Sequence, residues 1–319
     1  MPKRILYVVH RYAPYPGGSE NFVRDMAEET LSRGHDVWVL TEVHKGNLNG
    51  VKVSSDYNIL LQEWDLIVVH GGGVHVQDNV LANAANLKSP MLYMLIAPVL
   101  TPTCIKALQD CRYIGYSTNT DREYLIQSGV YHKSVLVRHS IAGKGSVGED
   151  GFKKKYGIST SRMFLSSGGF WPNKAMKELV TLFNEANVPD TTLVLTGYDN
   201  RYKIMPEETE FVKPFLVPSR DDVMSAVKEA DLYILHSTFE GFGLVLLESM
   251  YNNTQWAARR IAGAETMKDY GFTYTSDQEL IDYMRTFTPD EEVKRTAYDY
   301  VVNNRMIQHT VDDILKVLS

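Results

Sequence analysis

Residues 231–250 have the sequence DLYILHSTFEGFGLVLLESM, which contains a short apolar run, a glycine-rich loop and a second apolar run. The first run, Asp231–Ser237, is continuously apolar at its centre, which is typical of a strand covered on both faces of a parallel sheet. Glu240 stands in the loop, and Glu248 stands within the second run, which has the length of a helix. Because glycines let backbone amides approach a ligand at a helix N-terminus, the loop is a candidate anion site. The stretch therefore predicts one strand–loop–helix unit of an α/β fold.

Similar strand and helix patterns alternate along the rest of the chain. Glu20–Arg33 has apolar side chains at helical spacing, and Gly34 follows it, as glycine often does at a helix end. Helix starts are indicated at Ser276–Glu279 and Thr120–Glu123, which have the capping-box pattern, and at Thr288–Glu291, where proline would take the first helical position. This alternation predicts parallel sheets built from βαβ units. The other strand candidates are Ile5–His10, Asp36–Thr41, Asp65–Gly71, Met91–Ala97, Arg112–Thr118, Ser134–His139, Met163–Ser167, Thr191–Gly197 and Phe272–Thr275.

A glycine-rich segment divides the chain near its middle. Residues 142–151 contain several glycines and few apolar side chains, so we expect a linker there. The fold prediction is two Rossmann-like, doubly wound domains, residues 1–145 and residues 146–319, with the last helices from Pro289 onward crossing back to the first domain. Since doubly wound sheets bind ligands at the carboxyl ends of their strands, a shared site is expected in a cleft between the domains.

Composition and charge exclude several classes of protein. The 319 residues carry a net charge of −6, so no global basic field is available and no nucleic-acid partner is expected. Cys104 and Cys111 are too few for a zinc site or a disulfide scaffold, and we expect buried thiols. The longest uncharged stretch, Ser89–Ile105, contains three prolines and is shorter than the roughly 20 apolar residues that span a bilayer. We therefore expect no transmembrane segment and a cytoplasmic location, with peripheral membrane contact left open.

The sequence lacks the common metal and nucleophile motifs. No two aspartates stand two positions apart, so there is no Asp-x-Asp clamp, and no pair of histidines has the spacing of a metallohydrolase. Two further loops could instead hold an anion. Gly17 and Gly18 lie between a strand and a helix candidate, and Gly168–Lys174 follows another strand candidate. Lys174 could neutralise a phosphate as a point charge, so the chemistry is expected to need no metal and no cofactor.

Several of these segments resemble glycosyltransferase family four. Glu240 and Glu248, with seven residues between them in EGFGLVLLE, resemble the family signature. Gly17–Glu20 and Arg33–Val37, which reads RGHDV, resemble its N-terminal motifs, and Gly168–Lys174 resembles the loop of its phosphate-binding lysine. The resemblance implies a GT-B fold, in which two Rossmann-like domains face each other across a cleft, and a nucleotide-sugar substrate.

The resemblance also implies roles for individual residues. Lys174 would stabilise the departing phosphate and Glu240 would contact the transferred sugar, so these are the expected catalytic residues. Glu248 would hold the ribose hydroxyls, and the base would pack near Phe215–Val217. The other expected donor-binding residues, which line the diphosphate loops or supply backbone contacts, are Gly17, Gly18, Gly169, Gly241, Phe242, Gly243, Leu244 and Val245.

The implied reaction is metal-independent transfer of a sugar from a UDP- or GDP-sugar to a hydroxyl group of a glycan, lipid or other acceptor, with retention of anomeric configuration. Such a reaction depends on positioning and charge stabilisation, because the leaving phosphate helps to deprotonate the acceptor. Two alternatives stay open: a degenerate module that binds a nucleotide sugar without catalysis, and a GT-B-type nucleotide-sugar epimerase. The epimerase would need a histidine in the cleft, for which the candidates are His70, His75, His139 and His236.

Three positions depart from the family pattern. Gly169 stands where the family carries an arginine, which removes a charge-assisted contact worth roughly 1.5–3 kcal/mol. Residues 253–256 lack the family's glycine and proline, and no histidine stands near Leu95–Pro98. Either another cation replaces the arginine, or the enzyme is slow, selective or inactive. The candidate replacements are Arg138, Lys177, Arg259 and Arg260.

Overall fold

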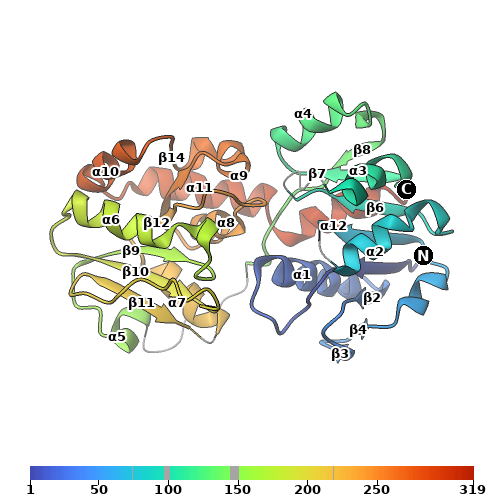
Figure 1. Cartoon of the computed structure of the whole chain (residues 1–319), viewed down its shortest axis with the longest axis horizontal. Coiled ribbons are helices and arrows are strands. Elements are labelled where there is room, and N and C mark those ends of the chain that lie inside the picture. The colour runs from blue at the N-terminus through green and yellow to red at the C-terminus, as the bar shows by residue number, and fades with distance from the viewer. Residues whose placement is uncertain (74, 97–100, 144–150, 218) are drawn as a thin grey trace. The chain divides into compact units, whose positions relative to one another are not determined.

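The chain forms two compact units in a computed structural model, which describes residues 1–73, 75–96, 101–143, 151–217 and 219–319. Unit 1 comprises Met1–Ala142 together with Arg305–Ser319, and unit 2 comprises Gly143–Asn304. Each unit has a mainly parallel β-sheet with helices packed on it (Figure 1). Most of the predicted linker, residues 144–150, lies outside the described residues.

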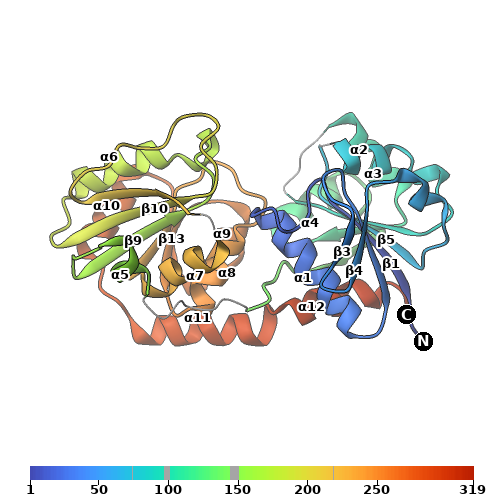
Figure 2. The same ribbon diagram turned by 90° about the horizontal axis from the view of Figure 1, so that it is seen from below.

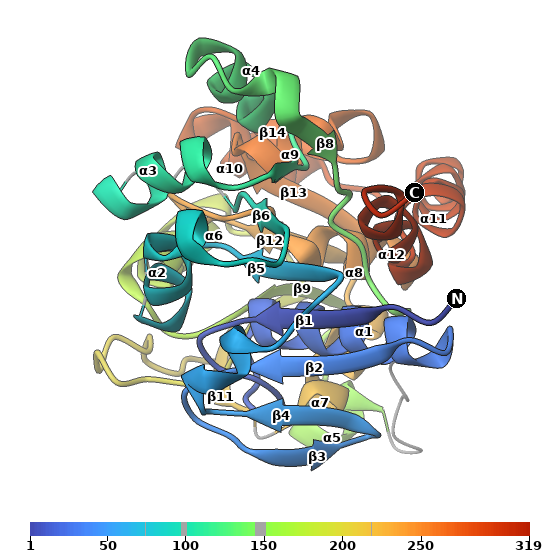
Figure 3. The same cartoon turned by 90° about the vertical axis from the view of Figure 1, so that its right-hand side faces the viewer.

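Unit 1 contains a sheet of eight strands in the order β3-β4-β2-β1-β5-β6-β7-β8. Figure 3 shows β3, β4, β2, β1 and β5 side by side in this order. Neighbouring strands are parallel, except for the antiparallel pair β3 and β4. The order reverses between β1 and β5, which makes their carboxyl ends the switch point of the unit. The strands are β1 (Arg4–Val8), β2 (Asp36–Leu40), β3 (Gly46–Leu48), β4 (Val51–Ser54), β5 (Leu66–His70), β6 (Met91–Met94), β7 (Tyr113–Tyr116) and β8 (Ser134–Leu136).

Helices cover both faces of this sheet. Alternate residues of β1 point to opposite faces, so the Tyr7 hydroxyl lies 2.7 Å from the Thr30 hydroxyl of α1, whereas Leu6 and Val8 join the core that α2 and α3 cover. Helix α12 packs beside α1 (Figure 2). The helices of the unit are α1 (Gly18–Ser32), α2 (His75–Ala82), α3 (Pro102–Asp110), α4 (Asn119–Gln127) and α12 (Ile307–Lys316).

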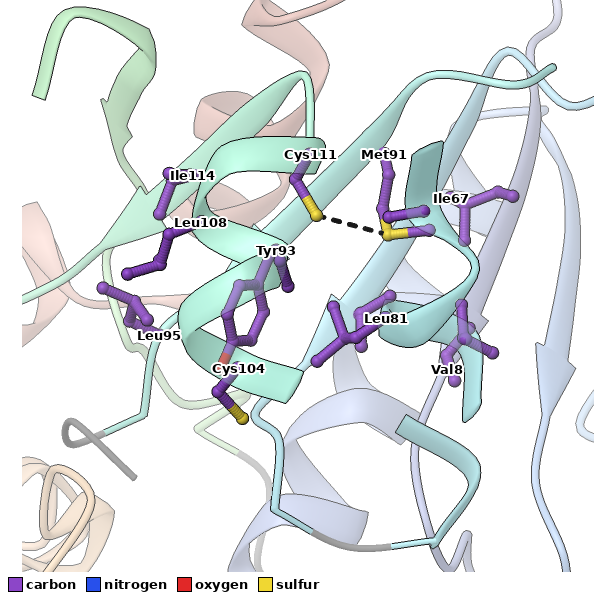
Figure 4. Packing of buried hydrophobic residues seen from close by; sticks show 14 of the residues in the cluster. Val8, Ile67, Leu81, Met91, Tyr93, Leu95, Cys104, Leu108, Cys111 and Ile114 are labelled. Atoms are coloured by element: carbon purple, nitrogen blue, oxygen red, sulfur yellow. Dashed lines mark hydrogen bonds between the residues drawn. The ribbon is translucent and has the colours of Figure 1, made fainter. Parts of the chain in front are cut away.

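Figure 4 shows the core of unit 1 around its two cysteines. Cys104 and Cys111 are both buried, and the Cys111 Sγ lies 3.5 Å from the Met91 Sδ. Burial raises the pKa of the Cys111 thiol to about 12, so its reactive thiolate form is scarcely populated at neutral pH. The prediction that both thiols are buried is confirmed.

The end of the chain is held within unit 1. Ile141 N donates to the Arg305 carbonyl at 2.9 Å, and Ile307 N donates to the Ile141 carbonyl at 2.8 Å. Arg138 forms a bidentate ion pair with the buried Asp313 of α12, with both Nε and Nη2 at 2.7 Å from its carboxylate oxygens. These contacts attach Arg305–Ser319 to the unit formed by the N-terminal residues.

Unit 2 contains six parallel strands in the order β11-β10-β9-β12-β13-β14. Side chains of α6 and α10 share one core cluster on one face of the sheet, and α5, α7 and α8 lie on the other face (Figure 2). The strands are β9 (Arg162–Ser167), β10 (Thr191–Gly197), β11 (Val212–Leu216), β12 (Leu232–Leu235), β13 (Gln255–Arg259) and β14 (Phe272–Tyr274). The helices are α5 (Phe152–Tyr156), α6 (Met176–Ala186), α7 (Arg220–Glu229), α8 (Leu244–Tyr251), α9 (Ala262–Thr266), α10 (Asp277–Thr286) and α11 (Glu291–Asn304).

The predicted α/β architecture with two doubly wound units is confirmed, and each predicted strand coincides with an observed one, with ends that differ by a few residues. The strands β3, β4, β11 and β13 were not predicted. Strand β11 has the sequence VKPFL, and Pro214 argues against a strand except at a sheet edge, which is where β11 lies. Strand β13 has the sequence QWAAR, whose polar ends leave too short an apolar run for recognition.

Two of the predicted helix starts are wrong by two residues. The capping box at Ser276 and Glu279 is confirmed for α10. Helix α4, however, is capped by Thr118 with Asp121 rather than by Thr120. In α11, the Asp290 carboxylate accepts hydrogen bonds from the backbone N–H groups of Glu292 and Val293. In both cases two side chains of capping type lie two residues apart; α4 uses the earlier one, Thr118, and α11 uses the later one, Asp290.

Candidate functional site

The strand order of unit 2 reverses between β9 and β12, and the two expected catalytic residues follow these strands. Strand β9 leads through Gly168 into the 3-10 turn Pro172–Lys174, and β12 leads through His236 to Glu240. In doubly wound sheets, ligands bind outside the carboxyl ends of the strands at such a switch point. The topology therefore brings Lys174 and Glu240 to the same edge of the sheet.

Lys174 and Glu240 form an ion pair. Lys174 Nζ lies 2.5 Å from Glu240 Oε1, and the two side chains are 15% and 14% exposed. The loops that carry them are also joined through the backbone, because Thr238 N donates to the Asn173 carbonyl at 2.8 Å. A charge-assisted hydrogen bond of this kind fixes both side chains in place. The structure thus brings the two residues together, with the ammonium already in contact with a carboxylate.

The glycine-rich loop 241–243 ends at the N-terminus of α8. Its last glycine has a φ of +84°, a left-handed conformation that favours glycine. The loop packs closely on the chain after β13, since a Cβ atom on Gly263 would lie 1.6 Å from the carbonyl oxygen of Phe242. Leu244 and Val245 begin the helix, where the first backbone N–H groups have no acceptor within the helix itself. This end of α8 therefore has the geometry of an anion site.

Glu248 is paired with an arginine that the sequence analysis did not single out. Arg220, the first residue of α7, contacts the Glu248 carboxylate through Nη2, and Glu248 is 8% exposed. The Ser219 hydroxyl caps α7 by accepting a hydrogen bond from Asp222 N at 3.2 Å. The Ser-x-x-Asp spacing could have indicated this helix start and a basic residue at the edge of the sheet. It could not have indicated which carboxylate the arginine contacts.

The four candidate replacements for the missing arginine have different surroundings in the structure. Arg138 is bound to Asp313 in unit 1, and Arg260 contacts Glu265 at 2.8 Å on the surface. Lys177 is exposed on the first turn of α6. Arg259, the last residue of β13, lies at the carboxyl edge of the sheet, beside the strand that leads to Glu240.

Arg259 is held by a neutral histidine. Its Nη2 lies 2.6 Å from His236 Nε2, and His236 Nδ1 lies 2.6 Å from the Tyr274 hydroxyl. Burial, together with the Arg259 charge, lowers the pKa of His236 to about 4, so the ring is neutral at pH 7 and its Nε2 accepts from the arginine. The carboxylate of Asp277 lies 3.5 Å from Arg259 Nη2 and is mostly exposed. Arg259 therefore presents a weakly compensated positive charge at this edge.

Gly169 does not present an open backbone. A Cβ atom on Gly169 would lie 2.5 Å from Cε2 of Trp171, so the indole ring covers this glycine. The ring packs edge-on against Tyr198, with centroids 5.7 Å apart and an interplanar angle of 82°. The position that carries an arginine in the family pattern is therefore closed by an aromatic ring in this chain.

The glycine pair of unit 1 lies at the start of α1. Gly17 is the N-cap residue, and a Cβ atom on it would lie 1.9 Å from Glu20 Oε2, so the Glu20 carboxylate folds over it. Glu20 also contacts Arg11 at 3.1 Å. A Cβ atom on Gly18 would have no heavy atom within 4 Å, apart from its chain neighbours, among the residues that the structure describes. Gly18, rather than Gly17, is thus the residue that a ligand can approach.

His70 and His139 are core residues of unit 1. Their ring centroids lie 6.0 Å apart, and both rings contact Phe22. Burial lowers the pKa of His70 well below its ordinary value and, together with the charge of Arg305, lowers that of His139 to about 3. A buried, neutral ring is poorly placed to exchange protons with a substrate, so His70 and His139 are poor candidates for the histidine that the epimerase alternative needs.

Among the residues that the structure describes, no group of three or more histidine, cysteine, aspartate or glutamate side chains is arranged to hold a metal ion. No helix in the described part of the chain is long and apolar enough to cross a membrane. The segment near Leu95–Pro98, where the family histidine is missing, lies partly outside that part, because it does not include residues 97–100.

Comparison with protein families gives a match to unit 2. Residues 149–300 match the family described as "Glycosyl transferases group 1". This range contains the strands β9 to β14 and both expected catalytic residues, Lys174 and Glu240. No curated protein sequence matches the chain.

Solved structures resemble the whole chain. Sucrose-phosphate synthase from Thermosynechococcus elongatus has a TM-score of 0.80 at 13% identity, with 99% of this chain and 98% of that protein covered. Anabaena HepE in complex with UDP and glucose has a TM-score of 0.76 at 17% identity, with 99% of each chain covered. WaaG, a glycosyltransferase involved in lipopolysaccharide biosynthesis, has a TM-score of 0.72 at 15% identity, also with 99% of each covered. These likenesses confirm the predicted GT-B fold. The family match over unit 2 identifies a glycosyltransferase.

Proposed function

We propose that this glycosyltransferase transfers a sugar from a UDP- or GDP-sugar to a hydroxyl group of a glycan or lipid-linked acceptor, as a retaining enzyme of family four. The observation that carries the proposal is the Lys174–Glu240 ion pair at the switch point of unit 2. Glu240 is followed by the glycine-rich loop 241–243, which ends at the N-terminus of α8. A cation and helix amides suit a diphosphate, and a carboxylate suits the hydroxyl groups of a sugar. The solved complexes of HepE with UDP and with UDP-glucose support a UDP-sugar donor.

The donor diphosphate, in this proposal, binds at the N-terminus of α8. The amides of Leu244 and Val245 and the ammonium of Lys174 contact its oxygens. Glu248 accepts hydrogen bonds from the ribose hydroxyls. It can do so while paired with Arg220, because that contact uses Oε1 and a carboxylate has a second oxygen with free lone pairs.

Charge stabilisation then drives the transfer. The bond between the anomeric carbon and the phosphate oxygen breaks as the acceptor hydroxyl attacks from the same face of the sugar. Negative charge grows on the leaving diphosphate, where Lys174 and the α8 amides stabilise it, and positive charge grows on the sugar, where Glu240 lies. The acceptor proton passes to an oxygen of the leaving phosphate, so no strongly basic side chain is required.

We further propose that the reaction needs no metal ion and no cofactor. Lys174, Arg259 and the N-terminus of α8 supply positive charge at the edge where the diphosphate binds. We also propose that the enzyme acts in the cytoplasm, with peripheral contact to a membrane when its acceptor is lipid-linked.

Release of UDP or GDP from a panel of nucleotide sugars tests the proposal. The wild-type protein should bind at least one donor and release nucleotide with a suitable acceptor. Lys174→Ala should lower kcat by about 10²–10³-fold, because the leaving group loses its stabilising cation. Lys228→Ala, in the exposed last turn of α7, is a matched control and should keep full activity. Binding without turnover would favour the nucleotide-sugar-binding module, and no binding of any UDP- or GDP-sugar would contradict the proposal.

A further inference from the structure

The indole of Trp171 occupies the space directly above Gly169. A Cβ atom on Gly169 would lie 2.5 Å from Cε2, 2.7 Å from Nε1 and 2.9 Å from Cδ2 of this ring, so no side chain can be added there while the ring stays in place. The loop therefore brings a large, flat, largely apolar surface to a position where the family pattern has a cation.

The ring is fixed by its neighbours. Trp171 N donates to the Gly169 carbonyl at 2.8 Å, which makes a tight turn and folds the side chain back over the glycine. The preceding residue, Phe170, is buried, and its backbone N donates to the Asp199 carbonyl at 2.8 Å. Tyr198 packs edge-on against the indole. A ring held on several sides loses little conformational freedom when a ligand packs against it.

Trp171 belongs to the same loop as the expected phosphate-binding lysine. Lys174 N donates to the Trp171 carbonyl at 2.9 Å, and a Cβ atom on Gly168 would lie 3.1 Å from Cε of Lys174. The lysine stem and the indole thus lie over two consecutive glycines. Trp171 is partly exposed, whereas Trp256, the other tryptophan of unit 2, is fully buried.

We infer that Trp171 is a sugar-binding residue, whose indole packs against the apolar C–H face of the transferred sugar ring while Glu240 accepts hydrogen bonds from its hydroxyl groups. The inference rests on the proposed function, because it names a further contact of the same donor site. An indole supplies a large apolar area with a polarised face, which suits a ring that has C–H groups on one side and hydroxyls at its edge.

The position of Trp171 relative to the sheet of unit 2 indicates that its ring contacts the sugar and not the nucleotide base. The loop of Trp171 leads into α6, on one face of the sheet, and is joined to the loop of Glu240 through Asn173. Glu248 and Arg220, where the ribose binds in the proposal, lie on α8 and α7, on the opposite face. The ring is therefore expected to improve the affinity for the nucleotide sugar and to leave that for the free nucleotide unchanged.

Tryptophan fluorescence tests the inference directly. The chain has four tryptophans, of which Trp38 and Trp64 are in unit 1 and Trp256 is fully buried, so Trp171 is the tryptophan of unit 2 that a ligand can reach. A nucleotide sugar should change the emission, free UDP or GDP should change it little, and Trp171→Phe should abolish most of the response. Trp38→Phe, on the unit 1 sheet, is the matched control and should keep the response.

Binding measurements on the same variants complete the test. Trp171→Leu should weaken nucleotide-sugar binding about tenfold and leave UDP or GDP binding unchanged. Gly169→Ala, whose new Cβ atom displaces the ring, should have the same effect in a protein that keeps Trp171. Circular dichroism and thermal unfolding confirm that each variant is folded. If these variants lost the same affinity for nucleotide and for nucleotide sugar, the inference about Trp171 would be overturned and the proposed function would stand. The same holds if they lost no affinity while the protein still transferred sugar. If the wild-type protein bound no nucleotide sugar, the proposed function would fail with it.

Discussion

Replacing Glu240 by glutamine should tighten the binding of free nucleotide while slowing sugar transfer. Lys174 Nζ contacts the Glu240 carboxylate at 2.5 Å, so a diphosphate that reaches the ammonium must share it with a negative charge. Two unit charges about 5 Å apart, on either side of one ammonium, repel each other by about 3 kcal/mol at an effective dielectric constant of about 20. Glutamine is nearly isosteric with glutamate and removes this repulsion.

The expected gain in affinity for UDP or GDP is about 1–3 kcal/mol, or roughly 5- to 150-fold, after allowance for partial screening by solvent. At the same time kcat should fall by about 10²–10³-fold, because no carboxylate faces the sugar as positive charge develops. Calorimetry with UDP and GDP, followed by steady-state kinetics with the donor, measures both effects. Glu248→Gln is the contrasting variant and should weaken nucleotide binding by about 1–3 kcal/mol through lost ribose contacts. Unchanged or weaker nucleotide binding by Glu240→Gln would refute the shared-ammonium argument.

Three further outcomes are expected. Arg259→Gln should weaken donor binding by about 1.5–3 kcal/mol in calorimetry, and unchanged affinity would show that Arg259 does not replace the missing arginine. EDTA should leave the transfer rate unchanged, and strict dependence on Mg²⁺ or Mn²⁺ would count against the metal-free proposal. Burial raises the pKa of Asp313, but the hydrogen bonds and the charge of Arg138 outweigh burial and hold this pKa below the ordinary value. The ion pair therefore stabilises unit 1 at neutral pH, and this stabilisation is lost as the pH falls below about 4. Arg138→Ala should therefore lower the free energy of unfolding by about 1–3 kcal/mol at pH 7 and by less at pH 3, and equal losses in urea titrations at the two pH values would contradict this account.

The strand, loop and helix within residues 231–250 could be predicted because several local signals coincide there. The continuous apolar run marks β12, and the left-handed Gly243 separates it from α8. Lys174 and Glu240 are 66 residues apart, yet their meeting follows from topology, because both stand just after strands at the switch point of a parallel sheet. Local pattern and fold rules therefore predict that the two loops meet at this edge, whereas the expected catalytic roles of Lys174 and Glu240 come from the family resemblance.

The partners of the site residues could not be predicted in the same way. Arg220 and Glu248 meet because α7 and α8 pack side by side with a particular rotation, which no sequence period specifies. The hydrogen bond between Arg259 and His236 likewise depends on the relative register of β12 and β13, in which Leu235 lies beside Ala258. Such contacts are set by side-chain packing in three dimensions, so the sequence could offer four candidate cations but could not choose among them.

Gly169 shows why an absence in a sequence pattern can mislead. Taken alone, glycine in place of arginine indicates a lost contact with the diphosphate and hence a weaker or inactive enzyme. In the structure, a side chain at position 169 and the folded-back indole of Trp171 exclude each other, because they would occupy the same space. A side chain at position 169 would therefore displace the indole of Trp171. If the indole packs on the sugar as inferred, this loop contacts the apolar face of the sugar instead of supplying a charge to the diphosphate, which favours binding of the complete donor over the released nucleotide.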